Sequence, residues 1–266
     1  MSSERSRFQV FIEGEIGCRD PVHIKQYREV LKELKLNSRH CNEAQGLIDD
    51  DCLDIYYKSC LSLAEALESI SLGAQSWAII KLYYSVYYSL KAELGLSGFG
   101  LVKCAGIYSI DVRRRLEPKK WSGRGDHITT TNVFKGLRGG QDLLLTNRIN
   151  EVAVYDWLRD KRERVQYRDR TFLEPDLSYF SEHFRDAQKF RERIGLYLDD
   201  TDAVYCFQDD HALLAAPLVR FKKLKTVLMG RGLPDPLLGR SDYIENCLEK
   251  FTRPGDSIRK LLLIHE

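Results

Sequence analysis

The order of hydrophobic and polar residues predicts a chain built mainly of helices. Between Asp49 and Gly73, apolar side chains recur every three or four positions, which places them on one face of an α-helix. Acidic residues at its start suit a helix N-terminus, and Gly73 suits a helix end. We therefore predict one amphipathic helix over 49–73. Its apolar positions are Leu53, Tyr56, Cys60, Leu63, Leu67 and Ile70.

The segment Ser76–Gly95 predicts a second helix that is apolar on nearly all sides. Its polar residues Lys81, Ser85 and Ser89 fall at every fourth position and form one narrow stripe. A helix of this kind belongs in the centre of a bundle, where neighbours cover several faces. Its tyrosines need hydroxyl partners in the core or an outlet to a cleft. These are Tyr83, Tyr84, Tyr87 and Tyr88.

Two further helices are predicted later in the chain, over 149–172 and after Pro175. The second has an apolar stripe at helical spacing, formed by Leu177, Phe180, Phe184, Ala187, Phe190 and Ile194. A long segment rich in glycine joins the Ser76–Gly95 helix to the next one, and we predict a connection there with a short helix near Val112–Leu116. Residues 49–200 therefore indicate an antiparallel helical bundle.

The two ends of the chain are predicted to be extensions of this bundle. Phe8, Val10 and Ile12 alternate with other residues, which favours a short strand, and Pro21 opens a helical pattern. The segment 37–47 is predicted to be a connection. We expect a mainly α protein with an N-terminal strand-and-helix extension at 1–48, a bundle at 49–200 and a small mixed C-terminal extension at 201–266.

Composition narrows the class of protein but not its chemistry. A chain of 266 residues with 43% hydrophobic and 30% charged residues can bury a core, so disorder is not expected. A net charge of +2 argues against a protein that coats nucleic acid. The first residues lack the apolar run of a signal peptide, and no stretch is long enough to cross a bilayer, so we expect a cytoplasmic protein without membrane contact. Seven cysteines without a C-x-x-C pair indicate reduced, buried thiols.

Common cofactor and metal motifs are missing from the sequence, and we expect no cofactor. No phosphate-binding glycine loop, metalloprotease motif or serine-hydrolase motif is present. The acidic residues Asp49, Asp50, Asp51 and Asp54 could ligate a metal ion, but helix capping is the favoured interpretation. The histidines show no metal-binding spacing.

One combination of motifs resembles the HEPN superfamily of helical domains. Tyr83, Tyr84, Tyr87 and Ala92 match the tyrosine-rich second helix of that superfamily, and Arg162 in "LRDKRERVQY" matches the arginine of its third helix. The resemblance covers residues 50–198. It implies a bundle of four to five helices and a role in toxin–antitoxin, antiviral defence or RNA-processing systems, either as a metal-independent ribonuclease or as a non-catalytic subunit.

The resemblance implies a site where Arg162 stabilises charge on a phosphate, and where a histidine one helical turn later moves protons. Tyr167 occupies the position of that histidine, and a tyrosine with an ordinary pKa is a poor base at neutral pH. On an uninterrupted α-helix, Arg162 and Tyr167 point roughly 140° apart. Gln166 shares the face of Arg162 and, with Tyr84 and Tyr87, is expected to line the cleft.

His127 is the candidate for the missing base, because a loop histidine could reach the site; an ordinary loop histidine is the alternative. Arg162 also has two alternatives to an RNA site. It could pair with a bundle carboxylate such as Asp54 or Glu65, or it could lie at a dimer interface. The candidate catalytic residues are therefore Arg162, Tyr167 and His127.

A basic segment in the C-terminal extension is a candidate nucleic-acid contact. Residues 218–233 contain no acidic side chain, and Phe221 lies among the cations. The candidate phosphate ligands are Arg220, Lys222, Lys223 and Lys225. An acidic partner protein or a simple solvated surface would explain the same pattern.

Two hypotheses for function follow. The first is an RNA-binding or RNA-cleaving component of a prokaryotic-type defence or toxin system, acting as a homodimer or with a partner defence protein. The second is a non-catalytic helical adaptor that binds a partner protein or a nucleotide.

Overall fold

The computed structural model describes residues 5–114, 117–123, 125–171 and 186–263, and it is mainly helical, as predicted. The α-helices of the described residues are α1 (Arg7–Glu15), α2 (Arg28–Lys32), α3 (Ser38–Ser71), α4 (Gln75–Leu96), α5 (Asp126–Arg138), α6 (Val154–Glu163), α7 (Ala187–Asp199), α8 (Asp209–Met229), α9 (Asp242–Glu249) and α10 (Ser257–Leu262). The longer strands are β1 (Phe99–Lys103), β2 (Ile107–Asp111) and β3 (Lys119–Trp121), and β4 (Arg148–Ile149) pairs with β5 (Val152–Ala153).

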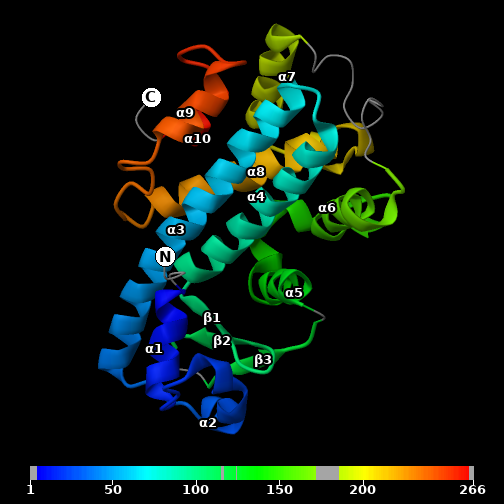
Figure 1. Cartoon of the computed structure of the whole chain (residues 1–266). Helices are drawn as coiled ribbons and strands as arrows, with labels where there is room; N and C mark the ends of the chain where they lie inside the picture. Colours follow the sequence, from blue (N-terminus) through cyan, green and yellow to red (C-terminus); the bar gives the residue numbers. More distant parts are fainter. Residues whose placement is uncertain (1–4, 115–116, 124, 172–185, 264–266) are drawn as a thin grey trace.

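Helices α3 and α4 form the antiparallel centre of the fold, and the other helices surround them (Figure 1). Gly73, with φ of +78°, ends α3 in the left-handed conformation that glycine adopts readily. The polar stripe predicted on α4 faces α3 in part. There, Ser59 donates to the Ser85 carbonyl at 2.8 Å and lies 2.8 Å from the Ser89 hydroxyl. The prediction of α4 as a central helix is confirmed, since α3, α5, α6, α8 and β1 all pack against it.

The predicted strand near the N-terminus is wrong, because these residues form helix α1. Phe8 and Ile12 are buried four residues apart, while Val10 is 44% exposed, which is a helical and not an alternating pattern. Asp51 caps this helix by accepting hydrogen bonds from the backbone N–H groups of Arg7 and Phe8 at 2.9 and 3.0 Å. The acidic residues therefore do not begin α3, which starts at Ser38 with Asn37 as its cap.

The glycine-rich segment after α4 was predicted to be a connection, but it contains an antiparallel sheet in the order β1-β2-β3 and, after the sheet, helix α5. A left-handed turn at Ala105 and Gly106 joins the first two strands. Gly100 allows β1 to approach α1, since a Cβ there would lie 2.1 Å from the Phe8 ring. The helix predicted near Val112–Leu116 is not formed in its described part, where Val112–Arg114 is a turn.

The C-terminal residues contribute to the same core as the rest of the chain. Helix α8 packs on α3, α4 and α7, and Phe221 is fully buried. Buried side chains from Phe8 to Leu263 form one continuous cluster, which crosses the predicted boundaries at 48 and 200. Phe190 and Ile194 of α7 are buried as predicted, whereas Leu177, Phe180 and Phe184 lie outside the described residues. None of the described helices is both long enough and apolar enough to span a membrane.

Candidate functional site

Arg162 lies in the last turn of α6 and is 8% exposed. Its guanidinium carbon lies 5.5 Å from the ring centre of Tyr83, 5.7 Å from that of Tyr84 and 5.2 Å from that of Tyr167. Arg162 Nη2 also donates to the Tyr84 hydroxyl at 3.4 Å. Aromatic faces attract a guanidinium electrostatically, so these rings hold the charge without neutralising it.

A π-helical turn brings Tyr167 to Arg162. The α-helix ends at Glu163, and Arg164–Arg168 form a π-helix in which the Asp169 N–H donates to the Arg164 carbonyl, five residues back. The expected separation of roughly 140° between Arg162 and Tyr167 is wrong, because it assumed an uninterrupted α-helix. The wider turn places residues five apart on the same side. Single π-turns within helices often occur at functional sites.

His127 packs on the same tyrosines from a different helix. It lies in the first turn of α5, and its ring centre is 5.7, 5.4 and 4.2 Å from those of Tyr83, Tyr84 and Tyr87. Burial and the nearby charge of Arg162 lower the pKa of the His127 imidazole below its ordinary value. The imidazole is therefore neutral at pH 7. Among the described residues, its buried Nδ1 has no hydrogen-bond partner.

The four tyrosines of α4, which we call the tyrosine cluster, form the base of this site: Tyr83, Tyr84, Tyr87 and Tyr88. Burial raises the pKa of Tyr83, and it raises that of Tyr87 to about 12 against the opposing effect of a hydrogen bond with Thr130. These hydroxyls stay protonated at neutral pH and can donate hydrogen bonds. Tyr167 covers the edge of the site and is 69% exposed.

Arg162 does not pair with the bundle carboxylates considered as its structural partners. Asp54 pairs with Arg7 and Arg240, at 2.9 and 3.0 Å. Glu65 lies 3.5 Å from Lys81 and accepts from the Tyr243 hydroxyl. No ion pair to Arg162 occurs within the described parts of the chain, where its buried Nε also lacks a hydrogen-bond acceptor.

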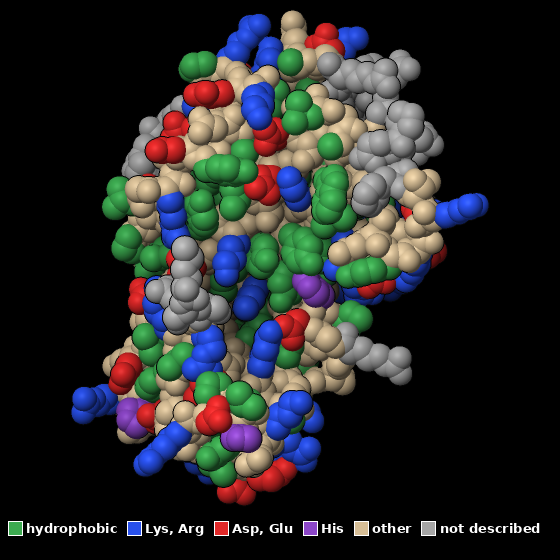
Figure 2. Space-filling view, in the orientation of Figure 1, with side chains coloured by type: hydrophobic (Ala, Val, Ile, Leu, Met, Phe, Trp, Pro, Cys, Tyr) green, Lys and Arg blue, Asp and Glu red, His purple; other side chains and the backbone are tan. Residues whose placement is uncertain are grey.

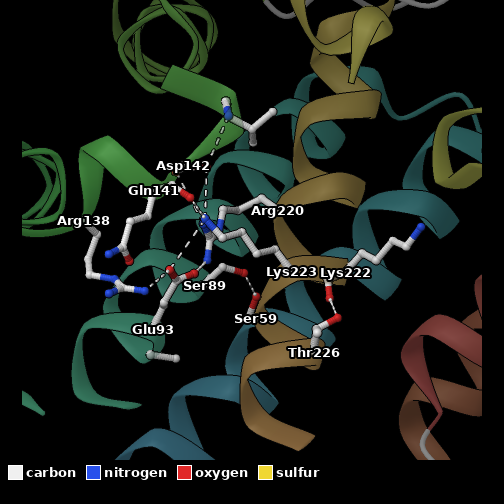
Figure 3. A network of polar contacts seen from close by, with 12 residues as sticks. Ser59, Ser89, Glu93, Arg138, Gln141, Asp142, Arg220, Lys222, Lys223 and Thr226 are labelled. Atoms are coloured by element: carbon white, nitrogen blue, oxygen red, sulfur yellow. Dashed lines mark hydrogen bonds and ion pairs between the residues drawn. The ribbon is translucent and has the colours of Figure 1, made fainter. Parts of the chain in front are cut away.

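The basic segment does not form the row of surface cations that the sequence predicted. Arg220 is fully buried and pairs with Glu93 and, at 3.5 Å, with Asp142 (Figure 3). The prediction of a phosphate contact is wrong for Arg220, because no part of it reaches the surface. Lys222, Lys223 and Lys225 donate to the carbonyls of Leu198, Gln141 and Lys260, at 2.6, 2.9 and 2.5 Å.

The structure thus joins some of the predicted site residues and separates others. Arg162, His127, Tyr84, Tyr87 and Tyr167 come together, although they come from three helices and a π-turn. Gln166 is exposed, and the basic segment belongs to a different region around α8. Glu93 was missed as the partner of Arg220. The signal for it was visible, because Glu93 continues the stripe of Lys81, Ser85 and Ser89 at the same spacing of four residues.

The acidic residues of α3 that were considered as metal ligands have structural roles. Asp51 caps α1, Asp54 binds two arginines, and Asp49 pairs with Arg231 at 3.0 Å. No group of three His, Cys, Asp or Glu residues within the described ranges could hold a metal ion. All seven cysteines are buried thiols, in agreement with the sequence prediction.

Comparison with known proteins gives no independent assignment: no protein-family model matches this chain, and neither a curated protein nor a solved structure matches it.

Proposed function

We propose that this chain is an HEPN-like protein that acts on RNA at the site formed by Arg162, His127 and the tyrosine cluster. One observation carries the proposal. Arg162 and His127 come from separate helices, and both pack against Tyr83 and Tyr84. Burial lowers the pKa of His127, and the nearby charge of Arg162 lowers it further.

The chemistry of these groups suits a phosphodiester with a neighbouring 2′-hydroxyl. The guanidinium of Arg162 would donate hydrogen bonds to the phosphate oxygens and stabilise the charge that develops on them. The neutral imidazole of His127 would accept the proton of the 2′-hydroxyl as that oxygen attacks phosphorus. The bond to the 5′-oxygen breaks, and a solvent proton completes the leaving hydroxyl. Exposed Tyr167 offers a ring on which a base can stack.

The biological setting remains that of the resemblance: a defence or toxin component that works as a homodimer or with a partner protein. The tyrosine at the position of the usual histidine distinguishes this chain from the active members of the superfamily. In our proposal His127 replaces it from α5, so the two functional groups are supplied by one chain.

The test is cleavage of a single-stranded RNA in EDTA by wild-type protein, Arg162→Ala, Arg162→Lys and His127→Ala. We expect a loss of at least about 100-fold in rate for Arg162→Ala and His127→Ala, as for other groups that stabilise a transition state or transfer a proton. Arg28→Ala is the matched control, because Arg28 is a half-exposed arginine paired with Glu29 on α2, at one end of the molecule (Figure 1). Its rate should equal that of wild type.

The alternative is a non-catalytic adaptor that binds RNA, a nucleotide or a partner protein through the same residues. It is favoured by the raised pKa values of Tyr83 and Tyr87, because hydroxyls that stay protonated cannot act as bases at neutral pH. Among the contacts described above, His127 is then the one group that could act as a base. RNA that stays intact while its binding weakens in Arg162→Ala would establish this alternative. Cleavage that persists in Arg162→Ala would contradict both the proposed ribonuclease and the non-catalytic alternative.

A further inference from the structure

A cavity of about 450 Å³ lies beside the tyrosine cluster, between α1, α3, α4, α5 and β1. On the face of the molecule shown in Figure 2, Lys and Arg side chains gather around a hollow between the N-terminal helix and α5. The volume suffices for a ligand of ordinary metabolite size. This cavity is not part of the site around Arg162, but Tyr87 contributes to both.

The cavity wall is largely apolar because α3 and α4 both contribute uncharged residues to it. Ile48, Cys52 and Ile55 line it from α3, at spacings of four and three residues. Gly95 completes the wall from α4, where a Cβ would lie 2.3 Å from Cys52 Sγ. Phe8 and Leu101 contribute apolar surface from α1 and β1. A ligand that fills the cavity therefore needs an apolar body.

The charged side chains at the cavity are paired, with one exception. Arg5 pairs with Glu13, Lys103 pairs with Asp126, and Asp51 accepts the backbone hydrogen bonds of α1. Lys91 lines the cavity from α4, one turn after Tyr87, and within the described residues it has neither an ion pair nor a hydrogen bond. The side chain is partly buried, so its ammonium group has lost part of its water shell without gaining a protein partner.

The surroundings of Lys91 do not compensate its charge. Burial lowers the pKa of Lys91, and the like charges of Lys103 and Lys58 lower it further. Asp126 and Asp51 act in the opposite direction, but each is engaged with another group. An uncompensated ammonium at the wall of an apolar cavity is costly, unless a ligand supplies the counter-charge.

We propose that this cavity binds a small carboxylic acid with an aliphatic or aromatic body, and that Lys91 forms an ion pair with its carboxylate. One unpartnered cation matches one negative charge. A nucleotide or polyphosphate would need several cations, but the other cations at this cavity are already engaged. The inference is independent of any action on RNA, because it rests on Lys91 and the cavity alone.

The test uses octanoate and 4-phenylbutyrate as probes, with 1-octanol and inorganic phosphate as comparisons, in calorimetric titrations of the full-length protein. We expect both acids to bind at least about tenfold more tightly than octanol, and phosphate not to bind measurably. Lys91→Met, which removes the charge and keeps the volume, should weaken binding of the acids at least tenfold. Lys103→Met is the matched control, since Lys103 lines the same cavity but has a partner, and its effect should be below about threefold.

A second measurement identifies the residue directly and does not depend on variants. An ammonium with a lowered pKa reacts faster with an amine-acylating reagent, so Lys91 should be modified early at pH 8, and octanoate should protect it. Equal affinity of wild type and Lys91→Met for octanoate would overturn the proposal. Binding of phosphate or of adenosine monophosphate in preference to the acids would overturn it as well, as would the absence of protection at Lys91 by saturating octanoate.

Discussion

Arg220 and Arg162 are both buried, but their surroundings differ in kind. Arg220 is fully buried with the carboxylates of Glu93 and Asp142, and Lys223 lies 3.8 and 3.5 Å from the same two groups (Figure 3). Arg162 has three aromatic rings and one hydroxyl around it. The charge of a guanidinium beside buried carboxylates is already compensated, whereas the charge of one held by rings stays available for an incoming anion.

The difference separates a structural arginine from a candidate functional one. The network around Arg220 links α4, α8 and the segment before β4, and Asp142 also accepts from the Tyr155 hydroxyl and the Leu144 N–H. Its members come from regions far apart along the chain, so it forms only with the fold. The Arg162 site is also assembled by the fold, but it includes exposed Tyr167 and half-buried His127.

The largest effect is expected from removing the charge of Arg220. Arg220→Met should lower the free energy of unfolding by about 3–5 kcal/mol, because Glu93 and Asp142 are left buried with only partly exposed cations nearby, Lys223 beside both and Arg138 at 3.6 Å from Glu93. Arg162→Met leaves no such carboxylate unpaired in the described chain, and its cost should be about 1 kcal/mol or less. Urea denaturation followed by circular dichroism measures both.

A double variant sharpens this result. Arg220→Met combined with Glu93→Leu should recover much of the lost stability, since both members of the buried pair are then apolar. If Arg162→Met destabilised the protein as strongly as Arg220→Met, the distinction between the two arginines would be refuted.

Lys91 offers a third case, in which a partly buried cation has no partner among the described residues. Lys91→Met should raise the free energy of unfolding at pH 7 by about 1 kcal/mol, because the cost of burying the charge disappears.

The pKa of Lys91 is lower in the folded than in the unfolded state, so the folded wild type gains stability as the pH rises through that pKa toward 10.5. The advantage of Lys91→Met should shrink over the same interval, as thermal melts at pH 7 to 10 would show. A loss of stability at pH 7 would mean that the ammonium is favourably placed.

The helical class and the central position of α4 could be predicted because both depend on the spacing of apolar residues alone. The sheet could not, since its strands have only three to five residues and β1 contains a glycine. Helix α1 was mistaken for a strand because Phe8, Val10 and Ile12 fit an alternating pattern, and only burial shows that Val10 faces outward.

The candidate site was predictable in its members but not in its geometry. Arg162, His127, Tyr84 and Tyr87 were identified from a family pattern and residue chemistry, but the π-turn that brings Tyr167 to Arg162 leaves no clear mark in the sequence. The basic segment was misinterpreted because the carboxylates that bury Arg220 lie elsewhere in the chain. Local charge density gives no information about such distant partners.

The smallest expected effect tests whether the charge of Arg162 acts on the imidazole of His127. In the folded protein the pKa of His127 should lie below 6.5, first because of burial and second because of the Arg162 charge. Arg162→Ala removes the second cause and should raise this pKa, whereas Arg28→Ala should not; NMR titration of the imidazole resonances measures all three proteins.

The folded state binds fewer protons at His127 than the unfolded state, so wild-type stability should fall as the pH drops from about 6.5 through the folded pKa. In Arg162→Ala that loss should be smaller and should begin at the same pH. A His127 pKa that is the same in wild type and Arg162→Ala would show that the two groups do not interact, and the comparison with Arg220 would then have no functional meaning.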